Sequence, residues 1–260
     1  MVAAMHASVP PPIDAELLLL AYRSGVFPMA DNRDDPEVFW VEPRRRAILP
    51  LDGFHCSASL ARTLRRGKFR VTCNAAFDAV IAACAEAAPD RAETWISGRI
   101  AASYRHLHRL GYAHSIECWH GENLVGGLYG VGFERVCCGE SMFSRVPDAS
   151  KVALAWLVAA LRRGGATLLA CQFMTTHLAS LGATEISQKR YVALLREAQA
   201  AGAGGGAAGA GAALGAGEGV ALAAGAGLPA GFAALLVDAA AAGFGSSPAN
   251  FIAQSLTQTS

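Results

Sequence analysis

The chain has no Cys-x-x-Cys pair and no His and Cys residues at a spacing suited to zinc. Its seven cysteines are an odd number, and the first residues, MVAAMHASVPPP, lack the basic and apolar regions of a secretory signal. No stretch is long and apolar enough for a membrane helix. We therefore expect reduced thiols, a cytoplasmic protein without a membrane partner, and no bound metal.

A strong excess of charge of one sign is also absent, since the formal net charge is +1 over 260 residues. The cations are nevertheless clustered, beside Phe39 and Trp40. Cations that neutralise phosphates next to an aromatic ring on which a base stacks are typical of nucleic-acid binding. A solvated charged face, with acidic residues nearby such as Glu37 and Glu42, is the alternative. The clustered residues are Arg44, Arg45, Arg46, Arg62, Arg65, Arg66, Lys68 and Arg70.

The order of the expected elements indicates an α+β fold. Residues 13–91 are expected to form a small N-terminal domain, which opens with a helix capped by Asp14 and ended by Gly25. Residues 92–198 read as a helix, three β-rich runs with short turns, a helix, a strand and a helix. A mixed sheet flanked by helices is compatible with the GNAT fold of acetyl-coenzyme A acyltransferases. However, their Gln/Arg-x-x-Gly-x-Gly/Ala pyrophosphate loop is missing here.

The C-terminal part, residues 199–260, is rich in alanine and glycine and nearly free of charge between about residues 199 and 245. Such a composition has a high backbone entropy and few large side chains to bury, so we expect a flexible tail. Phe251, Ile252 and Leu256 are apolar anchors that could dock back onto the domain.

Two polar residues are candidates for chemistry. Thr167–Phe173 is short and apolar, as in a buried strand, yet it contains Gln172. An unsatisfied buried amide costs about 1–3 kcal/mol, so Gln172 either ties up a backbone group or handles a substrate. Glu140, in CCGESMFSR, either accepts from an amine in a pocket, or caps a helix or pairs with Arg145 at the surface. His177 is interpreted as a helix or core histidine.

Eight runs occur in an order that resembles the bacterial leucyl/phenylalanyl-tRNA–protein transferases: LLAYRSGVFP, FWVEPRRRAIL, ETWISG, YRHLHRLGYAHSIECW, LVGGLYGV, CGESMFSR, DASKVAL and CQFMTTHLASLGA. The similarity covers roughly residues 13–198. The resemblance implies transfer of leucine or phenylalanine, with methionine a further candidate, from aminoacyl-tRNA to an N-terminal arginine or lysine. This transfer marks the acceptor protein for N-degron-dependent degradation. It also implies a monomer without a cofactor.

The resemblance further implies roles for particular residues. Gln172 and Glu140 match the residues at the reacting ester and at the α-amino group of the esterified amino acid. Trp40, Trp95 and Tyr104 match contacts to the 3′-terminal adenosine of the tRNA. Arg62, Arg65, Arg66, Lys68 and Arg70 are expected to hold the tRNA backbone. The aminoacyl pocket is expected to comprise Leu128, Cys137, Met142, Ser144, Leu154, Leu157, Leu161, Leu169 and Phe173.

One departure from the family lies beside Gln172. Many members have an aspartate two residues before this glutamine, where this chain has Ala170. Strand alternation would place both side chains on one face, so an aspartate there could orient Gln172, whereas alanine cannot. The aspartate is dispensable, is replaced by another group, or its loss leaves the chain slow or inactive. A non-catalytic tRNA-binding homologue and an acetyl-coenzyme A type N-acyltransferase are therefore the alternative functions.

Overall fold

The computed structural model describes residues 11–87, 94–203 and 227–257. In this part of the chain a seven-stranded sheet has the order β4-β5-β6-β7-β8-β3-β9, and β1 and β2 form a separate pair. The strands are β1 (Phe27–Met29), β2 (Phe39–Val41), β3 (Arg45–Ile48), β4 (Arg70–Cys73), β5 (Ala113–His120), β6 (Asn123–Phe133), β7 (Val136–Ser144), β8 (Leu168–Ala170) and β9 (Thr184–Ser187). The α-helices are α1 (Ala15–Arg23), α2 (Ala58–Arg65), α3 (Phe77–Cys84), α4 (Gly98–Arg109), α5 (Ala149–Arg163), α6 (Thr176–Ser180), α7 (Gln188–Ala203), α8 (Leu228–Ala241) and α9 (Pro248–Thr257). A short 3-10 helix spans Leu51–Gly53.

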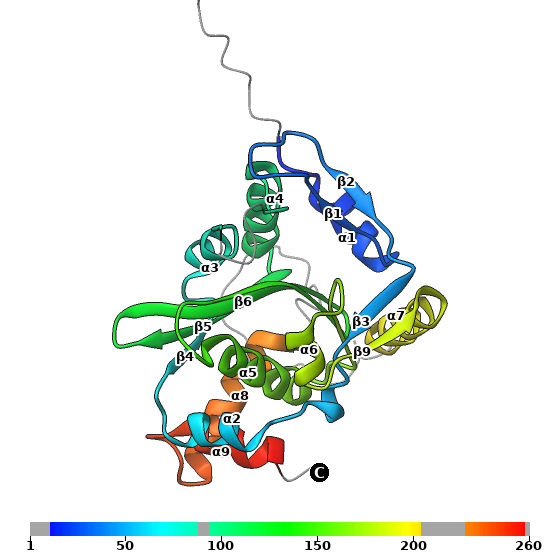
Figure 1. The fold of residues 1–260 in the computed structure, drawn as a ribbon. Helices are drawn as coiled ribbons and strands as arrows, with labels where there is room; N and C mark the ends of the chain where they lie inside the picture. The colour runs from blue at the N-terminus through cyan, green and yellow to red at the C-terminus, as the bar shows by residue number, and fades with distance from the viewer. Residues whose placement is uncertain (1–10, 88–93, 204–226, 258–260) are drawn as a thin grey trace, which may run out of the picture.

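Helices cover both faces of the sheet (Figure 1). Helices α1, α3 and α4 lie over one face, α5 crosses the other, and α2, α8 and α9 lie beyond α5. Two buried apolar clusters result, one that includes Leu154 and Leu157 of α5 and one that includes Ile100 and Tyr104 of α4. The expected α+β class is therefore confirmed. No helix in the described ranges is long and apolar enough to cross a membrane.

The expected antiparallel meander is confirmed in β5, β6 and β7, which pair in sequence order through two short turns. The pair β7–β8 is parallel, whereas β3 pairs antiparallel with both β8 and β9. The sheet is therefore mixed. Helix α5 is the connection that returns the chain from the end of β7 to the start of β8, which a parallel pair requires.

The helix signals in the sequence mark real helix ends. The Asp14 carboxylate accepts a hydrogen bond from the Leu17 N–H at 2.9 Å, and Gly25 follows α1 with a φ of +86°. Helix α4 likewise begins after Ser97, which caps the Ile100 N–H, and ends before Gly111 at a φ of +82°. Asp14 and Gly25, the expected start and stop residues of the first helix, are therefore correct.

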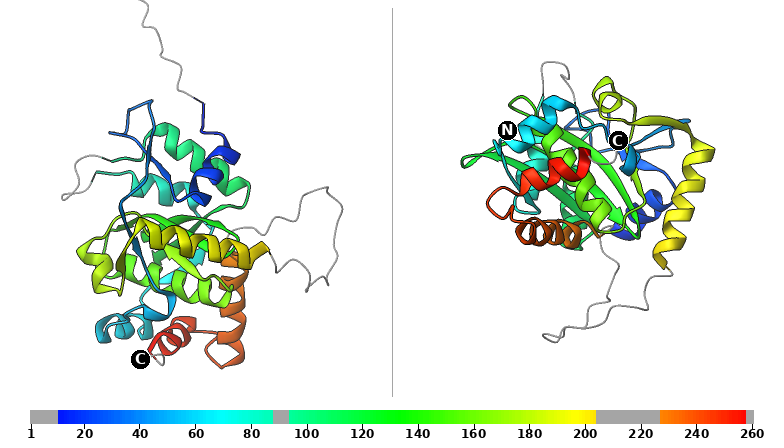
Figure 2. Two further views of the ribbon diagram at one scale, coloured as in Figure 1. Left: turned by 90° about the vertical axis from the view of Figure 1, so that its right-hand side faces the viewer. Right: turned by 90° about the horizontal axis from the view of Figure 1, so that it is seen from below.

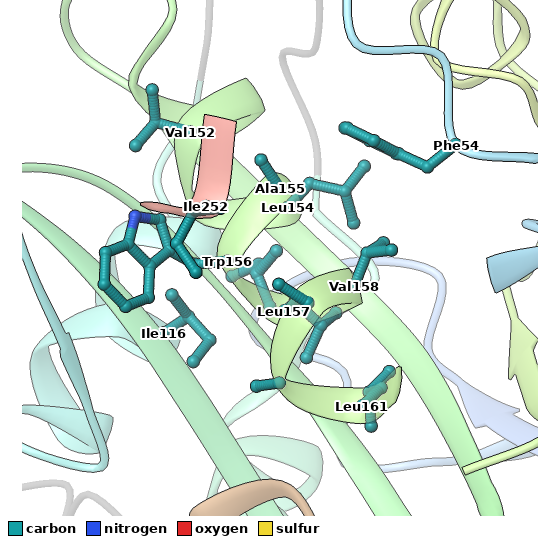
Figure 3. Packing of buried hydrophobic residues seen from close by; sticks show 14 of the residues in the cluster. Phe54, Ile116, Val152, Leu154, Ala155, Trp156, Leu157, Val158, Leu161 and Ile252 are labelled. Atoms are coloured by element: carbon teal, nitrogen blue, oxygen red, sulfur yellow. The ribbon is translucent and has the colours of Figure 1, made fainter. Parts of the chain in front are cut away.

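Helix α5 carries apolar side chains on nearly all sides, and neighbouring elements cover nearly all of them. Leu154 and Leu157 belong to the cluster between α5 and the sheet, and Trp156 packs at 5.2 Å from the ring of Phe232 in α8. Figure 3 shows the α5 side chains together with Ile116 of β5 and Ile252 of α9. A helix that is hydrophobic all round is a buried helix, and α5 is the central one of this protein.

The sheet is continuous across residue 91. Strands β3 and β4, which precede that point, pair with β8, β9 and β5, which follow it. The two expected domains, residues 13–91 and 92–198, thus share this sheet, and their division stays a prediction. Sequence periodicity marks the elements but carries no information on which strands pair across a long separation.

The C-terminal segment also differs from the expected tail. Residues 228–241 and 248–257 are the helices α8 and α9, which pack against α5 and α2 (Figure 2). Their buried anchors include Phe232, Leu235, Ile252 and Leu256, so the docking alternative is correct for this part. A Cβ at Gly231 would collide with the Ala160 carbonyl, which shows that glycine here permits close helix approach. Residues 204–226 lie outside the described ranges.

The strand expected over residues 167–173 is shorter in the structure. Strand β8 ends at Ala170, and Gln172 lies in the connection to α6. The register nevertheless continues, since the Cys171 N–H donates to the Ala47 carbonyl at 2.8 Å. Leu169 and Cys171 belong to the α5 cluster, whereas Leu168 and Ala170 belong to the α4 cluster.

Candidate active site

A cavity opens where two parallel strands separate. Strands β7 and β8 pair only between Val136–Cys138 and Leu168–Ala170. Beyond these residues β7 continues to Ser144, whereas the segment that follows β8 leaves the sheet. The cavity has a volume of about 270 Å³. Its walls include Leu154 and Leu157, and Glu140 and Gln172 lie at its polar edge. A mostly apolar cavity with few polar groups is typical of a small-molecule site.

Glu140 occupies a β-bulge in β7. Tyr129 and Gly130 are consecutive on β6, but their partners are Ser141 and Gly139, so Glu140 has no partner across the ladder. A bulge redirects the side chain of its extra residue. Gly130 is required beside it, because a Cβ there would lie 2.5 Å from the Cys138 carbonyl oxygen.

Glu140 and Gln172 are in direct contact. The Gln172 Nε2 donates to Glu140 Oε2 at 2.8 Å, and the Tyr104 hydroxyl donates to the same oxygen at 3.1 Å. The Tyr22 hydroxyl in turn lies 2.5 Å from the Tyr104 hydroxyl. Glu140 Oε1 is buried and has no hydrogen-bond partner among the described residues. The alternatives in which Glu140 caps a helix or pairs with Arg145 are wrong, because Arg145 pairs with Glu86.

The environment of Glu140 sets its protonation. Burial raises the pKa of this carboxyl to about 7, and this effect exceeds the opposing influence of its partners. The opposing influences that lower the pKa are the nearby hydroxyls of Tyr22 and Tyr104, the amide of Gln172 and the positive charge of Arg46. Glu140 therefore exchanges a proton close to neutral pH, as groups at active sites often do.

Most of the expected pocket residues line the cavity, and three do not. Leu161 and Cys137 belong to the buried cluster around α5 outside the cavity wall. The Ser144 hydroxyl donates to the Val146 carbonyl and accepts from the Ser150 N–H, so it shapes the turn into α5. The expected residues that line the cavity are Leu128, Met142, Leu154, Leu157, Leu169 and Phe173.

The three expected adenosine contacts have different positions. Trp95 lines the cavity, and Trp40 is 41% exposed on β2. The hairpin that carries Trp40 is tied to Trp95 through a hydrogen bond from the Ala30 N–H to the Trp95 carbonyl. Tyr104 differs from the expectation, because it is 0% exposed and has no surface to offer a base. Its hydroxyl supports Glu140 instead.

The basic residues around α2 are exposed and form no ion pair within the described ranges. They comprise Arg62, Arg65, Arg66, Lys68 and Arg70. The Thr63 hydroxyl of α2 donates to the Asp148 carboxylate at 3.1 Å, which connects this surface to the start of α5. These five cations are thus exposed and without an ion pair in the described part of the chain, as both a nucleic-acid surface and a solvated charged face require.

Two residues differ from their interpretation in the sequence, and His177 agrees with it. Arg46 belongs to the basic cluster in sequence but is 1% exposed, so it cannot contact a phosphate at the surface. His177 is a helix histidine, as expected, since it lies in α6; it also lines the cavity, and burial and Lys151 lower its pKa, which keeps it neutral. Tyr22 was not predicted as a site residue, because a tyrosine that follows Leu18 and Leu19 at helical spacing reads as core.

Comparisons with known proteins identify the family. The family described as "Leucyl/phenylalanyl-tRNA protein transferase" matches residues 48–196, and its N-terminal domain matches residues 12–44. The chain belongs to the leucyl/phenylalanyl-tRNA–protein transferase family. Members of this family are transferases, so this chain is a transferase enzyme.

Curated leucyl/phenylalanyl-tRNA–protein transferases resemble the chain closely. The protein of Novosphingobium aromaticivorans is 65% identical over 261 residues, which cover 96% of this chain and 98% of the relative. That of Rhizorhabdus wittichii is 60% identical and covers 70% of this chain and 74% of its own length. That of Zymomonas mobilis is 57% identical, with 72% of this chain and 69% of the relative covered.

Proposed function

We propose that the chain transfers leucine or phenylalanine from aminoacyl-tRNA to the N-terminal arginine or lysine of a protein. The observation that carries this proposal is the apolar cavity bounded by the hydrogen-bonded pair Glu140 and Gln172. The side chain of the esterified amino acid fills the cavity, and its α-amino group binds the unpartnered Oε1 of Glu140. The acceptor amine approaches the ester from the side of Gln172.

The reaction needs no covalent enzyme intermediate, because the tRNA ester is already activated. The neutral amine attacks the ester carbonyl carbon, and the C–O bond to the tRNA 3′ end breaks as the new amide bond forms. The amine proton leaves with the released tRNA hydroxyl. One N–H of Gln172 is held by Glu140, so its carbonyl oxygen is free to accept from the attacking amine. This hydrogen bond would orient the amine toward the ester carbonyl, and holding two reactants in an attack geometry lowers the activation barrier.

The shape of the cavity favours leucine and phenylalanine. Its wall combines branched apolar side chains with Met142, whose flexible thioether adapts to both aliphatic and aromatic groups. Isoleucine and valine carry a branch at Cβ, beside the α-amino group, and we expect this branch to crowd the cavity wall near Cα. Discrimination by such a wall amounts to about 1–3 kcal/mol per methylene. Methionine, which is unbranched at Cβ, is a further candidate substrate.

The tRNA is held by two surfaces in this proposal. Trp95 and Trp40 receive the 3′-terminal adenosine beside the cavity, and the exposed cations around α2 contact the backbone. The lack of ion pairs to these cations, in the part of the chain that the structure describes, supports this assignment. A mixed sheet whose parallel strands separate at the cavity supports a GNAT-like arrangement. We propose that the protein works as a monomer in the cytoplasm, where it marks proteins for degradation.

A transfer assay tests the proposal. The protein is incubated with tRNA charged with labelled phenylalanine and with a peptide that begins with arginine. We expect label on the peptide, and none on a control peptide whose N-terminus is acetylated. If the label stays on the tRNA at every protein concentration, while the tRNA binds, the chain is a tRNA-binding protein and not this transferase.

A further inference from the structure

Arg46 is a buried cation without a carboxylate partner in contact within the described ranges. It is 1% exposed, and neither its Nε nor its Nη1 has a hydrogen-bond partner in that part of the chain. Removing the partner of a buried charge commonly costs several kcal/mol, so a buried guanidinium without an ion-pair partner must be stabilised in another way. The neighbouring Arg45 points outward on the same strand and pairs with Glu185.

Two aromatic rings hold the guanidinium in place. Its central carbon lies 4.6 Å from the ring centre of Phe27 and 4.8 Å from that of Tyr191. Cation–π contacts from both rings offset part of the lost hydration. Phe27 also packs edge-on against Phe173 of the cavity wall, with 5.9 Å between the ring centres. The clamp that fixes Arg46 is therefore continuous with the cavity.

The strand register places Arg46 at the site. Ile48 is the partner of Ala170, and Cys171 bonds to Ala47, so the antiparallel register sets Arg46 opposite Gln172. Ile48 and Ala170 belong to the same buried cluster on the α4 side of the sheet. Arg46, two residues from Ile48 in the strand, faces that side as well. A carboxylate at position 170 would lie within reach of this guanidinium, and alanine leaves it without one.

We infer that Arg46 is a positioning residue of the candidate site, whose buried positive charge favours the carboxylate form of Glu140 that binds the aminoacyl amine. This inference rests on the proposed function. The charge of Arg46 reaches Glu140, where it opposes the effect of burial. Because residue 170 is alanine, no carboxylate at that position competes for this charge.

The other groups that face Glu140 do not supply a positive charge. Tyr22 of α1, Tyr104 of α4 and Gln172 act through hydrogen bonds. The thiols of Cys138 and Cys171 and the phenol of Tyr191 also interact with Glu140, and burial raises the pKa of each. These groups are therefore neutral near pH 7, and Arg46 is the cation among them.

Carbon-13 NMR of protein labelled at the glutamate carboxyl carbons tests the inference directly. The Glu140 signal is assigned by its loss in Glu140→Gln, and its titration midpoint is measured in each variant. We expect Arg46→Met to raise the midpoint by at least about one pH unit, and Arg46→Lys to restore it. Arg45→Met, on the same strand but facing outward, is the matched control and should change nothing.

A second variant keeps the test decisive if Arg46→Met does not fold. Ala170→Asp supplies a carboxylate partner to Arg46, so it should also raise the Glu140 midpoint. An unchanged midpoint in folded Arg46→Met, or a midpoint unchanged or lowered in Ala170→Asp, would overturn the inference.

The transfer reaction separates this inference from the proposed function. The acidic limb of the pH profile of kcat/KM should move to higher pH in Arg46→Met and return in Arg46→Lys. The titration of the acceptor amine is the same in every variant, so a difference between variants reports the enzyme. If the unchanged protein transfers nothing, the proposed function fails. If it transfers and Arg46→Met keeps the same profile, only the inference fails.

Discussion

The side-chain amide of Gln172 donates to the carboxylate of Glu140 at 2.8 Å. The two residues come from separate chain segments that part at this point, and their contact closes the polar edge of the cavity. The contact also gives Gln172 an orienting partner other than residue 170. An aspartate at position 170 is therefore not needed to hold the amide of this chain in place.

Changing Gln172 to Ala should slow transfer by about 10²–10³-fold, the loss typical of removing one oriented polar group that acts on the transition state. Binding of phenylalanyl-tRNA should be nearly unchanged, because the cavity wall and the cationic surface remain. Single-turnover transfer and filter binding measure the two effects. A large loss of tRNA binding, with an unaltered rate of transfer from the tRNA that is bound, would instead make Gln172 a structural residue.

The stability of the protein should fall as the pH rises through the titration of Glu140. Burial raises the pKa of Glu140 from 4.5 to about 7, so the folded protein binds more protons than the unfolded chain between these values. The contribution of protonated Glu140 to the free energy of unfolding is fully present below about pH 4.5. It is lost as the pH rises through 7, which lowers the free energy of unfolding by about 3 kcal/mol. Urea unfolding across this range measures it. Glu140→Gln should lack this component of the pH dependence while losing transfer activity.

Replacing Ala170 by Asp should couple to Arg46. The new carboxylate pairs with the buried guanidinium in the unchanged background but is an unpaired buried charge in the Arg46→Met background. We expect a coupling free energy of about 0.5–3 kcal/mol in a double-mutant cycle of Ala170→Asp and Arg46→Met, measured by urea unfolding. Additive effects of the two changes would show that the side chains do not meet. The transfer rate of Ala170→Asp well above pH 7 should match that of the unchanged protein, because Glu140 is then ionised in both.

The C-terminal helices offer a matched pair of leucines. Leu235 is 5% exposed and packs in the α5 cluster, whereas the adjacent Leu236 is 39% exposed. Leu235→Ala should lower the free energy of unfolding by about 2–5 kcal/mol, and Leu236→Ala should change it by about 0.5 kcal/mol or less. Thermal and urea unfolding distinguish the two. Equal small effects would mean that α8 does not dock on α5 in solution.

Arg65 should contribute a phosphate contact. Arg65→Ala should weaken tRNA binding for both leucine and phenylalanine forms and reduce the slope of log K against log salt by about one. Arg105, which already pairs with Asp78, is the control, and its change to Ala should leave the slope unaltered. A change in transfer rate without a change in salt slope would remove Arg65 from the tRNA surface.

Some features of the fold and of the site were readable from local sequence. Asp14 and Gly25 act within a few residues of themselves, through a cap and a left-handed turn, so their positions follow from short-range chemistry. Glu140 and Gln172 stood out as polar residues in apolar runs. The motif order then placed the chain in its family, although the distance between the two side chains was not visible in either run.

The sequence by itself determined the helix ends, the meander and the family, because these depend on local conformational preference and on the order of motifs. Only the tertiary structure decided that Arg46 is buried, that Tyr104 supports Glu140, and that the C-terminal helices dock. It also decided that the sheet crosses the expected domain boundary. Each of these depends on contacts between residues far apart in the chain. The local sequence around Arg46 is the same whether its side chain faces solvent or, as in the structure, two aromatic rings.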